Sequence, residues 1–211
     1  MAFVGKLFPN MEIDAMNEMG DTFKLNVLEE ARKNKKKVLL FWYPKDFTFV
    51  CPTELHAFQN ALQQFEDRNT MVIGASCDTP EVHFAWLNTP KNAGGIEGVT
   101  YPILSDTNRN LSNKLGILDI VSERYDEETD TVMYEGSNVT YRATYLIDEE
   151  GKVFHESVND MPLGRNVNEY LRLIDAYTHV QVKGEVCPAN WEEGKEAMQA
   201  NRDGVATYLS N

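Results

Sequence analysis

Residues 38–54, VLLFWYPKDFTFVCPTE, join an apolar stretch to a segment that carries a cysteine. Residues 38–43 are six consecutive apolar residues, far fewer than the ~20 that a membrane helix needs, and this pattern is typical of a buried strand. Pro44 ends the strand, and Pro52 fits the first turn of a helix because the amide there has no intrahelical partner. The stretch therefore predicts a strand, a loop and a helix, with Cys51 at the N-terminus of that helix.

Strand patterns alternate with helix patterns on both sides of this stretch. The predicted strands are residues 38–43, 71–76, 102–104, 142–147 and 152–157. The predicted helices are residues 25–33, 52–65, 81–87, 110–115 and 167–177. The last two strands flank the turn DEEG and form an antiparallel hairpin, whereas the earlier order is that of a parallel sheet. The chain is therefore predicted to be an α/β protein with a thioredoxin-like fold, a mixed central sheet flanked by helices.

Residues 181–211 differ in character from the rest of the chain, because they are polar and interrupted by glycine and proline. Such a segment has too few apolar residues to fold alone, so it must pack on the body or on a second subunit. We expect one domain over residues 1–180 and a C-terminal extension over residues 181–211 that carries Cys187. Residues 121–138 are acidic and longer than a typical connection, and we expect a surface excursion or an extra hairpin there.

The chain has 20 Lys and Arg residues against 33 Asp and Glu residues, a formal net charge of −13. This charge repels nucleic acids and acidic membrane surfaces, so we expect neither as a partner. The first residues contain no basic stretch followed by an apolar segment, so we expect no secretory signal and a cytoplasmic location.

Cysteine usage excludes further classes of protein. Cys51, Cys77 and Cys187 are odd in number and too few for a disulfide framework. None belongs to a C-x-x-C pair, and the four histidines lack metal-ligand spacing, so we expect no zinc site. Cys77 continues an apolar run and is expected to be a buried structural thiol.

Cys51 is the candidate nucleophile. Unpaired amides and the positive end of the helix dipole favour an anion at a helix N-terminus, and therefore a reactive thiolate. Thr48, three residues earlier, can bring its hydroxyl close to the sulfur. Placement alone leaves the electrophile open, because a peptide, a disulfide, a peroxide or a phosphoester all react with such a sulfur. A protease would need a histidine partner, and a thioredoxin-type disulfide reductase would need a second cysteine at the position of Glu54.

Four separated segments carry a resemblance to a known family. Residues 44–54 contain Pro-x-x-x-Thr-x-x-Cys, and residues 83–90, 141–148 and 184–191 read HFAWLNTP, YRATYLID and GEVCPANW. The first resembles the peroxidatic-cysteine motif of the peroxiredoxins, and the others follow in the family's order. The last resembles the resolving-cysteine segment of the typical two-cysteine class, which includes the alkyl hydroperoxide reductase C proteins and the thioredoxin peroxidases.

The resemblance implies a thiol peroxidase that reduces hydrogen peroxide and small alkyl hydroperoxides without a metal or organic cofactor. It implies that Cys51 attacks the terminal peroxide oxygen and becomes a sulfenic acid. It also implies that Arg142 is the active-site arginine and that Glu54 orients it. In the same way, Thr48 would hydrogen-bond the peroxide and Pro44 would shield the sulfur from water.

The resemblance further implies that Cys187 attacks the sulfenic acid of Cys51 and that the resulting disulfide joins two subunits. It implies a homodimer, assembled into a decamer of dimers, and reduction of the bridge by thioredoxin or a dedicated flavoprotein disulfide reductase. An alternative within the family is a ring-forming holdase chaperone or a peroxide-signalling protein. The intact set of Pro44, Thr48, Cys51 and Arg142 favours the enzyme.

Two departures from the family pattern predict resistance to over-oxidation. Sensitive members carry Gly-Gly-Leu-Gly in a loop and Tyr-Phe in the C-terminal helix, which delay unfolding around the peroxidatic cysteine. Here residues 94–98 read GGIEG and residues 208–209 read YL, so Glu97 and Leu209 break both elements. After turnover with millimolar peroxide and reductant, mass spectrometry should find little Cys51 sulfinic acid. Abundant sulfinic acid at low peroxide would contradict this prediction.

Overall fold

The computed structural model describes residues 2–120 and 122–210. The chain forms two compact units, Met1–Arg165 and Asn166–Asn211. The first unit contains the central sheet, and the second contains the long C-terminal helix and the segment that follows it.

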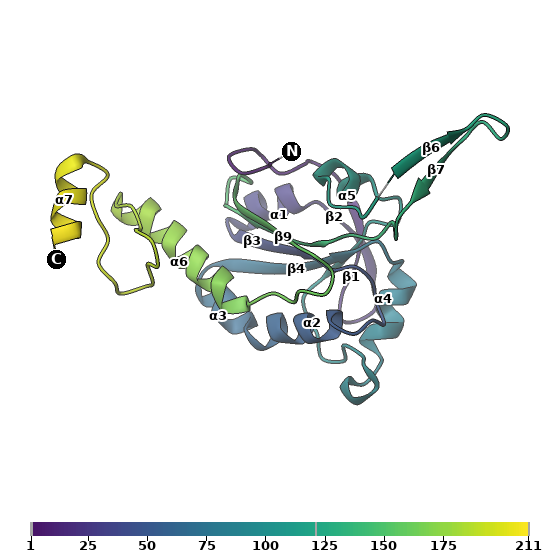
Figure 1. The fold of residues 1–211 in the computed structure, drawn as a ribbon. Helices are drawn as coiled ribbons and strands as arrows, with labels where there is room; N and C mark the ends of the chain where they lie inside the picture. The colour runs from purple at the N-terminus through teal and green to yellow at the C-terminus, as the bar shows by residue number, and fades with distance from the viewer. Residues whose placement is uncertain (1, 121, 211) are drawn as a thin grey trace. The chain divides into compact units, whose positions relative to one another are not determined.

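The first unit is built on a seven-stranded sheet with the strand order β2-β1-β5-β4-β3-β8-β9 (Figure 1). Its strands are β1 (Ile13–Met16), β2 (Thr22–Leu25), β3 (Lys37–Trp42), β4 (Thr70–Ser76), β5 (Ile103–Ser105), β8 (Arg142–Ile147) and β9 (Val153–Asn159). β4 pairs in parallel with both β3 and β5. The remaining neighbours pair antiparallel. The mixed sheet predicted from the sequence is confirmed.

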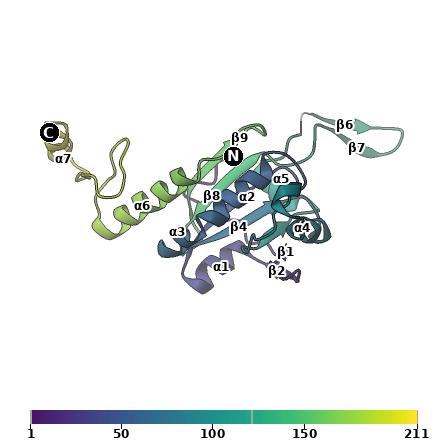
Figure 2. The same ribbon diagram turned by 90° about the horizontal axis from the view of Figure 1, so that it is seen from below.

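Helices cover both faces of this sheet (Figures 1 and 2). They are α1 (Val27–Asn34), α2 (Cys51–Asn60), α3 (Leu62–Asp67), α4 (Pro80–Leu87), α5 (Asn110–Leu115) and the 3-10 helix η1 (Lys91–Ala93). Side chains of β3 alternate between the two faces. Leu40 and Trp42 join a cluster with residues of α1 and α5, whereas the ring of Phe41 stacks on Phe58 of α2 at 4.1 Å. β3 is buried along its whole length because it is central in the sheet and covered on both faces.

Two features refine the sequence predictions for this unit. The acidic segment forms an extra hairpin of β6 (Ser122–Asp126) and β7 (Thr131–Glu135), as expected, although residue 121 lies outside the described residues. Figure 1 shows this hairpin extending away from the seven-stranded sheet. The single helix predicted over residues 52–65 is instead two helices, because Ala61 adopts φ −97° and ψ 3° and ends α2.

The second unit consists of α6 (Val167–Lys183), a segment without regular helix or sheet, and α7 (Arg202–Ser210). Gly184, with φ 67°, ends α6 in the left-handed conformation that glycine adopts readily. The following segment returns to α6. Arg172 donates a hydrogen bond to the carbonyl of Trp191 at 3.1 Å, and the rings of Trp191 and His179 lie 5.0 Å apart. No helix of the described residues is both long enough and apolar enough to cross a membrane.

Candidate active site

Cys51 lies where the strand-loop-helix pattern predicted it. It is the first residue of α2, and it is 0% exposed. The N-cap residue, Val50, supplies no side-chain hydrogen bond to the helix terminus. The first amides of the helix therefore receive no side-chain cap from Val50, and the positive end of the helix favours an anion at the sulfur.

Sheet topology brings Arg142 to this sulfur. β8 runs antiparallel to β3, so Arg142, its first residue, lies at the sheet edge where β3 ends. Its Nη1 donates to Cys51 Sγ at 3.4 Å and to Glu54 Oε2 at 2.6 Å. Its Nε donates to the carbonyl of Met161 at 2.6 Å, which fixes the plane of the guanidinium.

A second arginine completes the cluster. The backbone N and the Nε of Arg165 donate to Glu54 Oε1 at 3.0 and 2.8 Å, and its Nη2 donates to Oε2 at 2.8 Å. Its Nη1 donates to the carbonyls of Trp42 and Ala143, at 2.8 and 3.0 Å. The guanidinium also lies 5.0 Å from the ring centroid of Phe41. The role of Arg165 was not predicted from the sequence. An isolated arginine before an amphipathic helix does not indicate which residue it will pair with.

The charged side chains beside Cys51 carry a net positive charge. Two guanidinium groups and one carboxylate give +2 − 1 = +1, and the side chains of Arg142, Arg165 and Glu54 are 4%, 1% and 3% exposed. Water and salt screen such buried charges weakly. An anionic sulfur at Cys51 brings the buried cluster to neutrality, which is the environment that activates a cysteine as a nucleophile.

Pro44 and Thr48 lie on the loop between β3 and α2. Pro44 is buried, and Thr48 is half-buried and donates its hydroxyl to the carbonyl of Lys45 at 2.8 Å. Phe47 adopts φ 54°, which is uncommon outside glycine, and its ring lies 5.8 Å from that of Trp86. Hydrogen bonds donated by Arg142 thus join it to Cys51 and Glu54. Pro44 and Thr48 lie on the loop that leads to Cys51.

A buried polar cluster anchors the same loop. Asp46 Oδ2 lies 2.7 Å from His83 Nδ1, and its Oδ1 accepts from the hydroxyl of Tyr43 at 2.8 Å. The backbone N of Asp46 donates to Asp78 Oδ2 at 2.9 Å. Burial raises the pKa of the Asp46 carboxyl, and burial followed by that nearby charge raises the pKa of Tyr43 well above its usual value. The loop that carries Cys51 is therefore fixed to Tyr43, which follows β3, and to His83 of α4.

Cys187, the other predicted reacting cysteine, lies in the second unit. It is a free, half-buried thiol whose Sγ donates to the carbonyl of Ala176 at 3.6 Å. Burial raises its pKa above the usual value for a thiol. The structure thus places Cys187 against α6 as a free thiol.

Cys77 is expected to be the least reactive of the three thiols. It packs against the core, and burial raises its pKa from 9.0 to about 11. At pH 8 its alkylation by iodoacetamide should be ~100-fold slower in the folded protein than in urea, since two pKa units lower the thiolate fraction by that factor. The difference should disappear above pH 11. Equal rates in folded and unfolded protein at pH 8, measured by mass spectrometry, would contradict this prediction.

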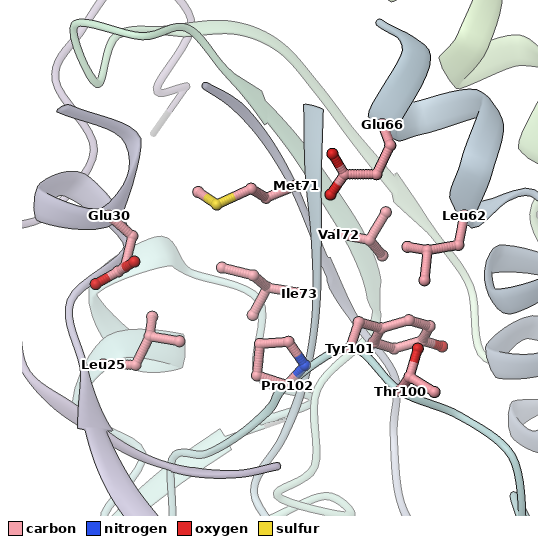
Figure 3. Close-up of a pocket in the computed structure, with 10 residues that line it drawn as sticks. All are labelled: Leu25, Glu30, Leu62, Glu66, Met71, Val72, Ile73, Thr100, Tyr101 and Pro102. Atoms are coloured by element: carbon pink, nitrogen blue, oxygen red, sulfur yellow. The ribbon is translucent and has the colours of Figure 1, made fainter. Parts of the chain in front are cut away.

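The cavity shown in Figure 3 lies elsewhere in the first unit. Its volume is about 250 Å³, and its walls are largely apolar, with the carboxylates of Glu30 and Glu66 on opposite sides. Lys36 already pairs with Glu66 at 2.7 Å. None of the predicted site residues lines this cavity. Across residues 2–120 and 122–210, no group of three or more His, Cys, Asp and Glu side chains is placed to hold a metal ion.

Comparison with known proteins finds two matching family models and similar relatives. The model of the AhpC/TSA family matches residues 4–156, and that of the C-terminal domain of 1-Cys peroxiredoxin matches residues 176–211. Alkyl hydroperoxide reductase C of Helicobacter pylori is 41% identical over 209 residues, 98% of this chain and 96% of the relative. Peroxiredoxin-1 of Gekko japonicus is 38% identical, over 99% and 96% of the two chains.

Solved structures show the same similarity. The reduced 2-Cys peroxiredoxin of Plasmodium vivax superposes with a TM-score of 0.88 at 38% sequence identity, covering 100% of each chain. This similarity confirms the predicted thioredoxin-like fold and its helical C-terminal extension.

Proposed function

The chain belongs to the AhpC/TSA family and is a peroxiredoxin, and we propose that it reduces hydrogen peroxide and small alkyl hydroperoxides through Cys51. One observation carries this proposal. The sulfur of Cys51 is buried at a helix N-terminus and lies 3.4 Å from the guanidinium of Arg142, within a cluster of net positive charge. An anionic sulfur in such a site is a strong nucleophile toward the O–O bond.

The first step forms one S–O bond and breaks one O–O bond. The Cys51 thiolate attacks the terminal oxygen of the peroxide and becomes a sulfenic acid, while the departing oxygen takes a proton and leaves as water or an alcohol. Arg142 stabilises the negative charge that develops on the departing oxygen. Thr48 binds the peroxide through its hydroxyl, Pro44 excludes water, and Glu54 holds Arg142 in place.

The second step forms a disulfide. The thiol of Cys187 attacks the sulfenic sulfur of Cys51, and water leaves. We place this bridge between the two subunits of a homodimer, assembled into a decamer of dimers, with thioredoxin or a flavoprotein disulfide reductase supplying the two electrons that reopen it. The similarity to 2-Cys peroxiredoxins supports this assignment. The three free thiols fit a cytoplasmic location, where disulfides are kept reduced.

Thiol counting at limiting peroxide tests the function. The two steps consume two thiols for each hydrogen peroxide, so reduced protein should lose two thiols per peroxide and retain the thiol of Cys77. Free thiols are measured with a chromogenic disulfide after unfolding the protein. A thiol count that does not change while peroxide persists would rule out the peroxidase assignment.

A further inference from the structure

The buried position of Cys51 means that its helix must open before the disulfide can form. The sulfur is 0% exposed, and a disulfide requires a second sulfur at about 2.05 Å. α2 has ten residues and no side-chain cap at its N-terminus. An isolated helix of this length is marginally stable, so tertiary contacts decide how often the first turns of α2 open.

Hydrogen bonds of three α2 residues join this helix to residues 95–101. Nε2 of His56 lies 3.0 Å from the carbonyl oxygen of Gly95. One turn later, Gln59 Oε1 accepts from the backbone N of Thr100 at 2.9 Å. The hydroxyl of Tyr101 donates to the carbonyl of Leu55 at 2.8 Å. α2 contributes the side chains of His56 and Gln59 to these bonds. His56 is the nearer of the two to Cys51 in the sequence.

The acceptor of the His56 bond is held rigidly. A Cβ atom at Gly95 would lie 1.8 Å from the carbonyl oxygen of Thr89, so the backbone there is closely packed. The backbone N of Gly95 donates to the carbonyl of Pro90 at 3.0 Å. Ile96 is 0% exposed. Because Gly95 cannot follow the helix, opening α2 breaks the hydrogen bond to His56.

Among the described residues, the imidazole of His56 makes no hydrogen bond other than the one to Gly95. A carbonyl oxygen only accepts, so Nε2 of His56 carries a proton and donates it to Gly95. Nδ1 is buried and has no hydrogen-bond partner among the described residues. A buried polar atom without a partner is unfavourable and calls for a structural reason. Here the ring position brings Nε2 within hydrogen-bonding distance of the carbonyl of Gly95.

We propose that His56 is a positioning residue that holds the Cys51 helix closed and so sets the rate at which the disulfide forms. The consequence for catalysis rests on the proposed peroxidase function, whereas the restraint itself does not. By keeping Cys51 sulfenic acid in place for longer, His56 acts against the resistance to over-oxidation expected from Glu97 and Leu209. The restraint belongs to α2 and residues 95–101, not to the C-terminal extension.

The restraint can be measured without any peroxide. In reduced protein, alkylation of Cys51 by iodoacetamide reports how often the helix opens, and Cys77 in the same chain is the reference thiol. We expect His56→Leu and His56→Ala to alkylate Cys51 about fivefold faster, the factor for one hydrogen bond of roughly 1 kcal/mol. His56→Gln, which retains a donor, should restore a rate near that of the wild type. Circular dichroism confirms that each variant is folded.

Gln63→Leu is the matched control. In the part of the chain that the structure describes, the side chain of Gln63 bonds only within its own helix, to Asp67 at 2.9 Å, so its replacement removes a side-chain hydrogen bond without affecting residues 95–101. Unchanged Cys51 alkylation in both folded His56 variants would overturn the proposal, as would equal acceleration in Gln63→Leu. Hydrogen exchange of the α2 amides gives a second measure in the wild type and His56→Gln if the other variants do not fold.

A second measurement connects the restraint to catalysis. At fixed peroxide and reductant, His56→Leu should yield a lower ratio of Cys51 sulfinic acid to disulfide than the wild type, because the opened helix reaches the second thiol sooner. An unchanged ratio with faster alkylation would overturn the link to disulfide formation while leaving the restraint intact. Failure of the wild type to form any disulfide would instead count against the peroxidase assignment.

Discussion

The variant Cys51→Ser should lose peroxide consumption by ~10³-fold or more, because the serine hydroxyl cannot supply the nucleophile that splits the O–O bond. The change is nearly isosteric, and the buried site should keep its fold. Peroxide consumption is followed in the presence of dithiothreitol, which replaces the physiological reductant and makes the assay independent of Cys187.

Cys77→Ser is the matched control for this experiment. Cys77 packs against the core and lies outside the Arg142–Glu54–Arg165 cluster, so its replacement should leave peroxide consumption near the wild-type rate. If Cys51→Ser retained wild-type consumption, or if Cys77→Ser lost as much, the nucleophile would be wrongly assigned.

Replacing Glu54 with glutamine should destabilise the protein severely. Its carboxylate accepts four of the hydrogen bonds donated by Arg142 and Arg165, all in an interior that is almost inaccessible to water. Removing one partner of a buried ion pair costs about 3–5 kcal/mol, because the remaining charges stay buried without compensation. For a chain of this length, that corresponds to a fall of roughly 10 °C in the unfolding midpoint. Urea unfolding of the reduced protein at constant protein concentration measures the loss.

An exposed ion pair offers the comparison. Glu169 pairs with Arg172 at 2.7 Å on α6, where the two side chains are 50% and 31% exposed. Because such pairs contribute little, Glu169→Gln should change the free energy of unfolding by less than about 1 kcal/mol. Equal losses in Glu54→Gln and Glu169→Gln would show that the buried cluster has no special energetic role.

The local pattern of the sequence was sufficient for five of the seven strands of the sheet, the hairpin and the position of Cys51, whereas β1 and β2 were not among the predicted strands. An unbroken apolar run, a proline after the strand and a proline in the first helical turn each act on the residues beside them, so they can be read without a structure. The contact between Arg142 and Glu54 was predicted only through resemblance to a family. The strand order explains it physically, because antiparallel β3 and β8 place the end of one beside the start of the other.

Other features depend on long-range packing and could not be predicted from local sequence patterns. Arg165 acts through Glu54, 111 positions away, and no spacing rule connects them. The end of α2 at Ala61 involves neither glycine nor proline, so helical periodicity alone predicted a continuous helix. The polar composition of residues 181–211 predicted a C-terminal extension without placing α7 in it, and only the family resemblance indicated a helix at residues 208–209. The division into a domain over residues 1–180 and an extension over residues 181–211 stays a prediction.

One nonreducing gel tests the central claim, that Cys51 is oxidised by peroxide and resolved by Cys187 of another subunit. Reduced protein is treated with one equivalent of hydrogen peroxide as wild type, as Cys51→Ser, as Cys187→Ser and as the two variants coexpressed. We predict a disulfide-linked dimer for the wild type and the coexpressed pair, with Cys51 joined to Cys187 in the peptide map, and none for either variant alone. A monomer with an internal disulfide, or a dimer band in Cys51→Ser alone, would contradict the mechanism.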